Sequence, residues 1–272
     1  MNRLTRPLYL PAVAMTALLA VTACDVERHS SRDARATITR NWPAAGVHQV
    51  KVVEVDGSIT VDAAPGNEIS LLATAKGDID IKKGEENDGL FETRLEGDTL
   101  RIGRKERRHK GWNVTFLWGH EDVQIDYVLK VPATVSLAVS TVNGRIETRG
   151  VEGETEARTV NGSIDIESAG LAELQATTVN GRVKAKFTRG FQGARFKTVN
   201  GGVEATLPND ASFAVNLSQV NGDFEASFPL SIHSNPGSRR VSGEVNGGRF
   251  ELKIVTVNGD VELARLDPKQ VR

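Results

Sequence analysis

The tripeptide Val-Asn-Gly recurs seven times, and this repeat constrains the fold more than any other feature of the sequence. The copies begin at Val142, Val160, Val179, Val199, Val220, Val245 and Val257. The first four intervals lengthen from 18 to 21 residues, whereas the copy at Val245 is out of phase and Val257 lies 37 residues after Val220. An earlier echo of the motif is Val55-Asp56-Gly57. Self-similarity at such a period is typical of stacked repeat architectures.

Each unit also has the same internal pattern of side chains. A Thr precedes most copies, with Gln219 as the exception among those that are in phase, and apolar and polar residues alternate after the Gly, as in Ile164-Asp165-Ile166. Alternation with a period of two indicates a strand that has one buried face and one exposed face. The sequence therefore predicts an all-β fold.

Asn-Gly is a turn signal because both residues tolerate positive φ, and two architectures can use it. One is a β-solenoid in which each unit of 18–21 residues is one coil, so that equivalent asparagines lie ~4.8 Å apart. The alternative is an antiparallel hairpin meander or sandwich. We favour the solenoid because identical residues at identical phase are useful when units stack in register. The predicted structural corners are Asn143, Gly144, Asn161, Gly162, Asn180, Gly181, Asn200, Gly201, Asn221, Gly222, Asn258 and Gly259.

The first 23 residues have the features of an export signal. Arg3 and Arg6 are followed by an apolar stretch that is too short to span a bilayer as a helix, and small residues precede Cys24. The segment resembles a bacterial lipoprotein signal, which implies cleavage before Cys24 and a diacylglycerol on its thiol. Alternatively, Cys24 is a leftover thiol after an ordinary secretory site. Because Cys24 is the only cysteine, acylation would remove an unpaired thiol from an exported chain.

The rest of the chain is expected to form one continuous β unit. Residues 24–45 are polar and are predicted to be a lipid-anchored tether, and residues 267–272 a tail. Between them, 46–132 is predicted to be an irregular part of the β domain and 133–266 its regular repeats. Strands are expected near 49–55, 58–61, 69–75, 90–95, 99–102 and 123–131.

These motifs together resemble a known family. The segments Glu54–Val61 and Tyr127–Pro132 and the run of Thr-Val-Asn-Gly units are similar to the bacterial putative-adhesin β-repeat family over roughly residues 46–265. The resemblance implies a solenoid-like fold in an envelope-associated protein. It implies no catalytic residues.

One segment interrupts the regular pattern with basic and aromatic residues. The candidate surface contacts there are Arg104, Arg107, Arg108, Trp112, Phe116 and Trp118. Such a segment could bind anionic lipid or envelope polysaccharide. Alternatively, the aromatic residues cap the solenoid and the cations are simply solvated.

Catalytic chemistry has little support in the sequence. The histidines are scattered, and no nucleophile or phosphate-loop motif is present. Glu147 and Asp165 could form an acidic row of the kind found in β-helix lyases, but Lys184 interrupts it. We expect no cofactor and no metal site, and the net charge of −1 argues against nucleic acid as a partner.

The favoured function is a non-catalytic lipoprotein, held on the periplasmic or extracellular side of a bacterial membrane, that acts as an adhesin-like scaffold or binding module. The alternatives are a carbohydrate-active β-helix protein and an envelope-stress sensing protein that engages an envelope protein partner.

Overall fold

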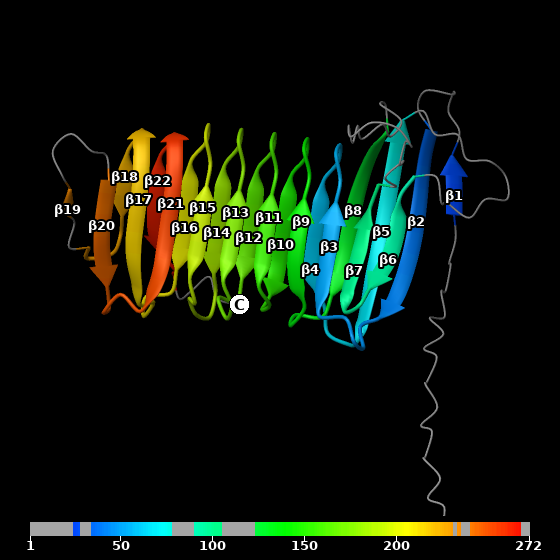
Figure 1. Ribbon diagram of the computed structural model, residues 1–272, viewed down its shortest axis with the longest axis horizontal. Helices are drawn as coiled ribbons and strands as arrows, with labels where there is room; N and C mark the ends of the chain where they lie inside the picture. The colour runs from blue at the N-terminus through cyan, green and yellow to red at the C-terminus, as the bar shows by residue number, and fades with distance from the viewer. Residues whose placement is uncertain are drawn as a thin grey trace, which may run out of the picture.

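The protein is a long, flat stack of two β-sheets that lie face to face (Figure 1). The computed structural model describes residues 24–27, 34–77, 90–104, 123–230, 233–234 and 240–267. Every element in these ranges is a strand, and each sheet contains 11 strands. No helix that could cross a bilayer occurs in the same ranges.

The first sheet carries the strands that follow the Asn-Gly corners. In spatial order its strands are β1 (Cys24–Glu27), β2 (Ala34–Pro43), β5 (Glu68–Gly77), β8 (Gln124–Val131), β4 (Ile59–Ala63), β10 (Ile146–Val151), β12 (Ile164–Ser168), β14 (Val183–Phe187), β16 (Val203–Leu207), β22 (Val261–Arg265) and β18 (Phe224–Ala226).

The second sheet carries the strands that precede the corners. In spatial order all the strands of this sheet are β19 (His233–Ser234), β20 (Arg240–Val245), β17 (Phe213–Asn221), β21 (Phe250–Asn258), β15 (Ala194–Lys197), β13 (Leu174–Thr177), β11 (Thr155–Arg158), β9 (Ser136–Ser140), β3 (Gln49–Val53), β7 (Thr99–Gly103) and β6 (Glu92–Glu96).

Equivalent residues of neighbouring coils pair in parallel and in register, which confirms the solenoid prediction. Ile146 pairs with Ile164, Ile164 with Val183, and Val183 with Val203. The expected alternation is also present, because these four residues are buried while their chain neighbours Glu147, Asp165 and Lys184 face outward. Apolar side chains of both sheets fill the space between them as one continuous core.

The physical reason for glycine differs from the one predicted from sequence at every predicted corner except that of Gly222, which has positive φ. Among the described non-glycine residues only Asn246 has positive φ, so the corner asparagines do not require the left-handed region. Coil packing imposes glycine instead, since a Cβ on Gly162 would lie 1.9 Å from the carbonyl oxygen of Gly144, and one on Gly181 would lie 1.9 Å from that of Gly162. Successive backbones approach too closely at this corner for any side chain.

The coils do not stack in the order of the sequence at either end. The coil of β21 and β22 is inserted between the coil of β15 and β16 and that of β17 and β18, so Asn258 lies between Asn200 and Asn221. The expectation that Asn221 directly follows Asn200 is therefore wrong. At the other end the coil of β3 and β4 lies inside that of β7 and β8, although it comes first in the sequence.

Antiparallel strands extend the stack beyond the parallel coils. At the N-terminal end β5 pairs antiparallel with β8, and β2 pairs antiparallel with β5. The predicted tether over 24–45 is thus wrong for residues 34–43, which form β2, because their alternating Ala36, Ile38 and Arg40 side chains are buried. Cys24–Glu27 pairs with β2 as β1.

The out-of-phase Val-Asn-Gly copy belongs to the other end of the stack. β20 pairs antiparallel with β17, so Asn246 and Gly247 follow a strand that runs against the coils. At this end, β20 and the two-residue strand β19 extend the second sheet beyond β17 by antiparallel pairing.

Candidate functional site

The predicted corner residues form one continuous hydrogen-bonded ladder along an edge of the stack. Each Asn donates its Nδ2 to the Oδ1 of the previous coil: Asn161 to Asn143, Asn180 to Asn161, Asn200 to Asn180, Asn258 to Asn200 and Asn221 to Asn258, at 2.8–2.9 Å. Asn143 donates to Asp56 at 2.7 Å. All six asparagines are exposed, so the ladder presents neutral amides to the solvent.

A second ladder lies directly beneath this one and is buried. Thr178 donates its hydroxyl to the carbonyl of Gly162 at 3.0 Å, and Thr198 donates to that of Gly181 at 3.1 Å. Thr141, Thr159 and Thr256 make the equivalent bonds. Gln219, the exception in the sequence, fills the same role because its Nε2 donates to the carbonyl of Gly259 at 2.8 Å. The ladder therefore requires a donor at this position.

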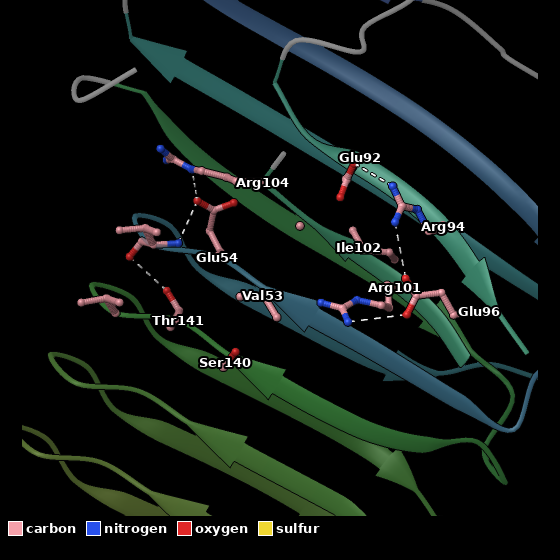
Figure 2. A pocket seen from close by; sticks show the side chains of 13 residues that line it. Val53, Glu54, Glu92, Arg94, Glu96, Arg101, Ile102, Arg104, Ser140 and Thr141 are labelled. Carbon is pink, nitrogen blue, oxygen red and sulfur yellow. Dashed lines mark hydrogen bonds and ion pairs between the residues drawn. The ribbon is translucent and has the colours of Figure 1, made fainter. Parts of the chain in front are cut away.

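Glu54 occupies the threonine position of the coil that contains Asp56, and it is a buried charged residue. Its Oε1 accepts the backbone N–H of Val55 at 2.9 Å and pairs with Nε of Arg104 (Figure 2). Its Oε2 accepts the hydroxyl of Tyr127 at 2.9 Å. Arg104 also donates to the carbonyl of Val123. The regular ladder thus ends in a fully bonded ion pair rather than in another hydroxyl.

Burial and hydrogen bonding act in opposite directions on this carboxyl group. Burial raises the pKa of Glu54 above its ordinary 4.5, while the bonds from Val55, Arg104 and Tyr127 oppose that rise only in part. Burial also raises the pKa of Tyr127 well above 10, reinforced by the nearby Glu54 carboxylate. Tyr127 therefore remains a neutral donor, and the cluster is suited to holding two elements together.

A shallow hollow of about 280 Å³ opens beside this ion pair on the second sheet. Val53 and Ile102 contribute apolar surface to it, and alternating acids and arginines line the side formed by β6 and β7 (Figure 2). Arg94 lies within 3.6–3.7 Å of both Glu92 and Glu96, and Arg101 lies 3.6 Å from Glu96. The charges at this rim pair among themselves.

The predicted surface contacts are only partly within the described residues. Arg104 is present, but its side chain is 13% exposed and its guanidinium is occupied by Glu54 and Val123, so its assignment as a surface contact is wrong. Arg107, Arg108, Trp112, Phe116 and Trp118 lie outside the described residues. Sequence reasoning missed Glu54, although a Glu in the phase of a buried Thr was a signal that it needed a cationic partner.

Acidic side chains gather at the opposite end of the first sheet. Insertion of β22 places Glu262 between Glu204 and Glu225, which pair with it in register. Together with Asp223 and Asp260 they line a hollow of about 460 Å³. Lys184 forms an ion pair with Glu204 at 2.6 Å on the inner side of this group.

The pair of acids considered for catalysis lies side by side but is neutralised. Glu147 and Asp165 occupy paired positions on β10 and β12. Arg149 contacts Glu147, and Arg145 contacts Asp165 at 2.6 Å. Within the described ranges no group of three or more His, Cys, Asp or Glu residues is arranged to hold a metal ion.

Comparison with known proteins relates the chain to one family and to three distant structures. Similar solved structures include a putative cell adhesion protein from Clostridium sporogenes (9% identity, 85% of this chain and 100% of that chain, TM-score 0.45), a putative adhesin from Bacteroides fragilis (11%, 84% and 96%, 0.28) and a putative lipid binding protein from Parabacteroides distasonis (13%, 85% and 97%, 0.29). They are too distant for a ligand to be transferred.

No curated protein matches the chain. The family model described as Toastrack DUF4097 matches residues 43–264, which include strands β3 to β21 and the whole Asn ladder. The chain therefore belongs to the Toastrack DUF4097 family.

Proposed function

We propose that the protein is a non-catalytic binding module or scaffold of the bacterial envelope, anchored to the outer side of a membrane by lipid on Cys24. The observation that carries this proposal is the continuous register from Asp56 to Asn221. It makes the coils one rigid body whose interior is filled by side chains. In such a stack the outward residues are what differs from coil to coil, so recognition is assigned to the outer faces.

The distribution of charge supports a surface role. Outward acids and bases on the first sheet form ion pairs between coils, as Arg149 does with Asp62. At the C-terminal end of the sheet, outward acids gather around one hollow. The envelope ligands consistent with this proposal are a polysaccharide, an anionic lipid surface or another envelope protein. Family membership is compatible with each of them and selects none.

The anchor is tested by expressing the full chain in bacteria supplied with labelled palmitate. We expect label in the protein and sedimentation with membranes, and we expect both to be lost in a Cys24→Ser variant. The matched control is Ser31→Ala, which changes a nearby polar residue without touching the thiol. Absence of label from the unaltered chain would refute the lipid anchor.

The absence of catalysis is tested separately, by incubating the Cys24→Ser protein with isolated envelope glycans. We expect saturable sedimentation of the protein with envelopes and no release of reducing ends. Release that is abolished by Glu147→Ala or Asp165→Ala would replace the binding role with a carbohydrate-cleaving one.

A further inference from the structure

We propose that Asn221 is a site of spontaneous deamidation, and that the ladder protects the other Asn-Gly pairs within it. All six ladder asparagines are exposed and each is followed by glycine, so exposure and local sequence alone would give them similar reactivity. Their hydrogen bonding differs, because only Asn221 lies at the open end. This inference does not depend on the proposed ligand or anchor.

The reaction is an intramolecular substitution followed by hydrolysis. The backbone nitrogen of Gly222 attacks Cγ of Asn221, a new N–Cγ bond forms, and the Cγ–Nδ2 bond breaks. The amide leaves as ammonia and takes up the proton lost by the Gly222 nitrogen. Water then opens the resulting succinimide to aspartate or isoaspartate, so the net change is amide plus water to acid plus ammonia.

At Asn161, Asn180, Asn200 and Asn258 both reacting groups are held by neighbouring coils. Asn180, for example, donates Nδ2 to Asn161 at 2.8 Å and accepts at Oδ1 from Asn200 at 2.9 Å. The nucleophile is also engaged, since the N–H of Gly181 donates to the carbonyl of Asn200 at 3.1 Å. Attack requires these bonds to open together, and such opening carries a free-energy penalty within a packed stack.

Asn221 lacks two of these three restraints. Its Nδ2 donates to Asn258 at 2.8 Å, but within the described part of the chain nothing donates to its Oδ1 and nothing accepts the N–H of Gly222. Gly222 is itself exposed. Its φ of 127° lies in a region open to glycine, so the nucleophile sits on a backbone with wide conformational freedom.

Conversion of Asn221 would alter an already acidic end of the molecule. It replaces the donor to Asn258 with a carboxylate and adds a negative charge two residues from Asp223. The hollow at this end is lined by five carboxylates and one arginine. The terminal coil therefore loses a hydrogen bond and gains repulsion in one step.

The test is peptide mass spectrometry of the folded protein aged at mildly alkaline pH, with aspartate and isoaspartate counted at each Asn-Gly pair. We expect Asn221 to convert at least about tenfold faster than Asn161 or Asn180, a ratio that corresponds to about 1.4 kcal/mol of protection. In urea, where the ladder is absent, the rates should converge. Equal rates in the folded protein, or faster conversion at Asn161 or Asn180, would overturn the proposal.

Two variants make the comparison independent of any general unfolding. Asn221→Gln keeps the amide but disfavours the five-membered ring, so conversion at position 221 should stop while Asn161 and Asn180 are unaffected. Asn258→Ala removes the donor to Oδ1 of Asn200 but keeps the bond from the N–H of Gly201 to the backbone carbonyl of residue 258, so Asn200 loses one of the two restraints that Asn221 lacks. The rate at Asn200 should rise, and an unchanged rate there would contradict protection by the ladder.

Discussion

Asn143 donates its side-chain amide to Oδ1 of Asp56 at 2.7 Å, and this bond fixes the direction of the entire ladder. An ionised aspartate can only accept hydrogen bonds, so it suits the end toward which every amide donates. The five amide–amide bonds that follow all point the same way, toward Asp56. Aligned amides polarise one another, which strengthens the series beyond isolated pairs.

Removal of an interior side-chain amide should therefore lower the free energy of unfolding more than removal of the terminal one. Asn180→Ala eliminates the bonds to Asn161 and from Asn200, so we expect a loss of about 1–3 kcal/mol at about 0.5–1.5 kcal/mol for each bond. The matched control, Asn221→Ala, eliminates one bond and should cost about half as much. Urea unfolding measures both, and equal losses would contradict a cost that follows the number of ladder bonds removed.

The corner glycines should tolerate no side chain. In Gly181→Ala the new Cβ would lie 1.9 Å from the carbonyl oxygen of Gly162, which is backbone and can move only if the coils separate. We expect a destabilisation of about 3 kcal/mol or more, among the larger single-site effects. Gly190→Ala is the matched control, because its Cβ would meet its nearest atom at 3.4 Å. Similar melting temperatures for the two variants would contradict the close approach.

Removal of a buried threonine hydroxyl should lower the free energy of unfolding more than removal of an adjacent outward one. Thr178→Val removes the bond to the carbonyl of Gly162 while preserving shape, so we expect a loss of about 1–3 kcal/mol from leaving a buried acceptor short of a donor. Thr177→Val, at the adjacent outward position, should change stability by no more than about 0.5 kcal/mol. Chemical denaturation of both variants shows whether stability depends on the hydrogen bond of the buried hydroxyl or only on the β-propensity of the residue. Equal changes in the two variants would contradict a role for the hydrogen bond.

The repeating part of the fold was predictable because residues at the same phase of the sequence repeat pair with one another in neighbouring coils. The phase of Val-Asn-Gly placed Asn143 beside Asn161 correctly, since each residue of one coil contacts its equivalent in the next. The order of the end coils was not predictable. The coil that ends at Asn258 carries the same corner as the one that ends at Asn221, and local sequence does not specify which of them covers Asn200.

The candidate site was predictable only in part. Arg104 was singled out by its basic neighbourhood, but its true partner Glu54 is 50 residues away, and only the fold brings the two together. The signal lay in the echo Glu54-Val55-Asp56-Gly57, where an acid stands at a position that is elsewhere a buried Thr. Strand β2 was missed because its alternation begins within a polar stretch that follows the anchor.

The Glu54–Arg104 pair should leave a signature in the pH dependence of stability. Because burial raises the pKa of Glu54, the folded state binds more protons than the unfolded state between the unfolded value of 4.5 and the folded value. Stability from this group is thus greatest below 4.5 and falls as the pH rises through the folded pKa. Glu54→Gln should remove this slope, because the amide does not titrate.

Asp126→Asn is the control with the opposite sign. Burial alone would raise the pKa of Asp126, but hydrogen bonds from Ser58 and the ion pair with Lys76 at 3.1 Å lower it overall from 3.8. Its stabilisation is present above 3.8 and is lost as the pH falls through the folded pKa. Urea unfolding across the acidic range should show Glu54→Gln flattening the upper part of the curve and Asp126→Asn flattening the lower part. A slope above pH 4.5 that survives in Glu54→Gln would show that the buried carboxyl group is not its source.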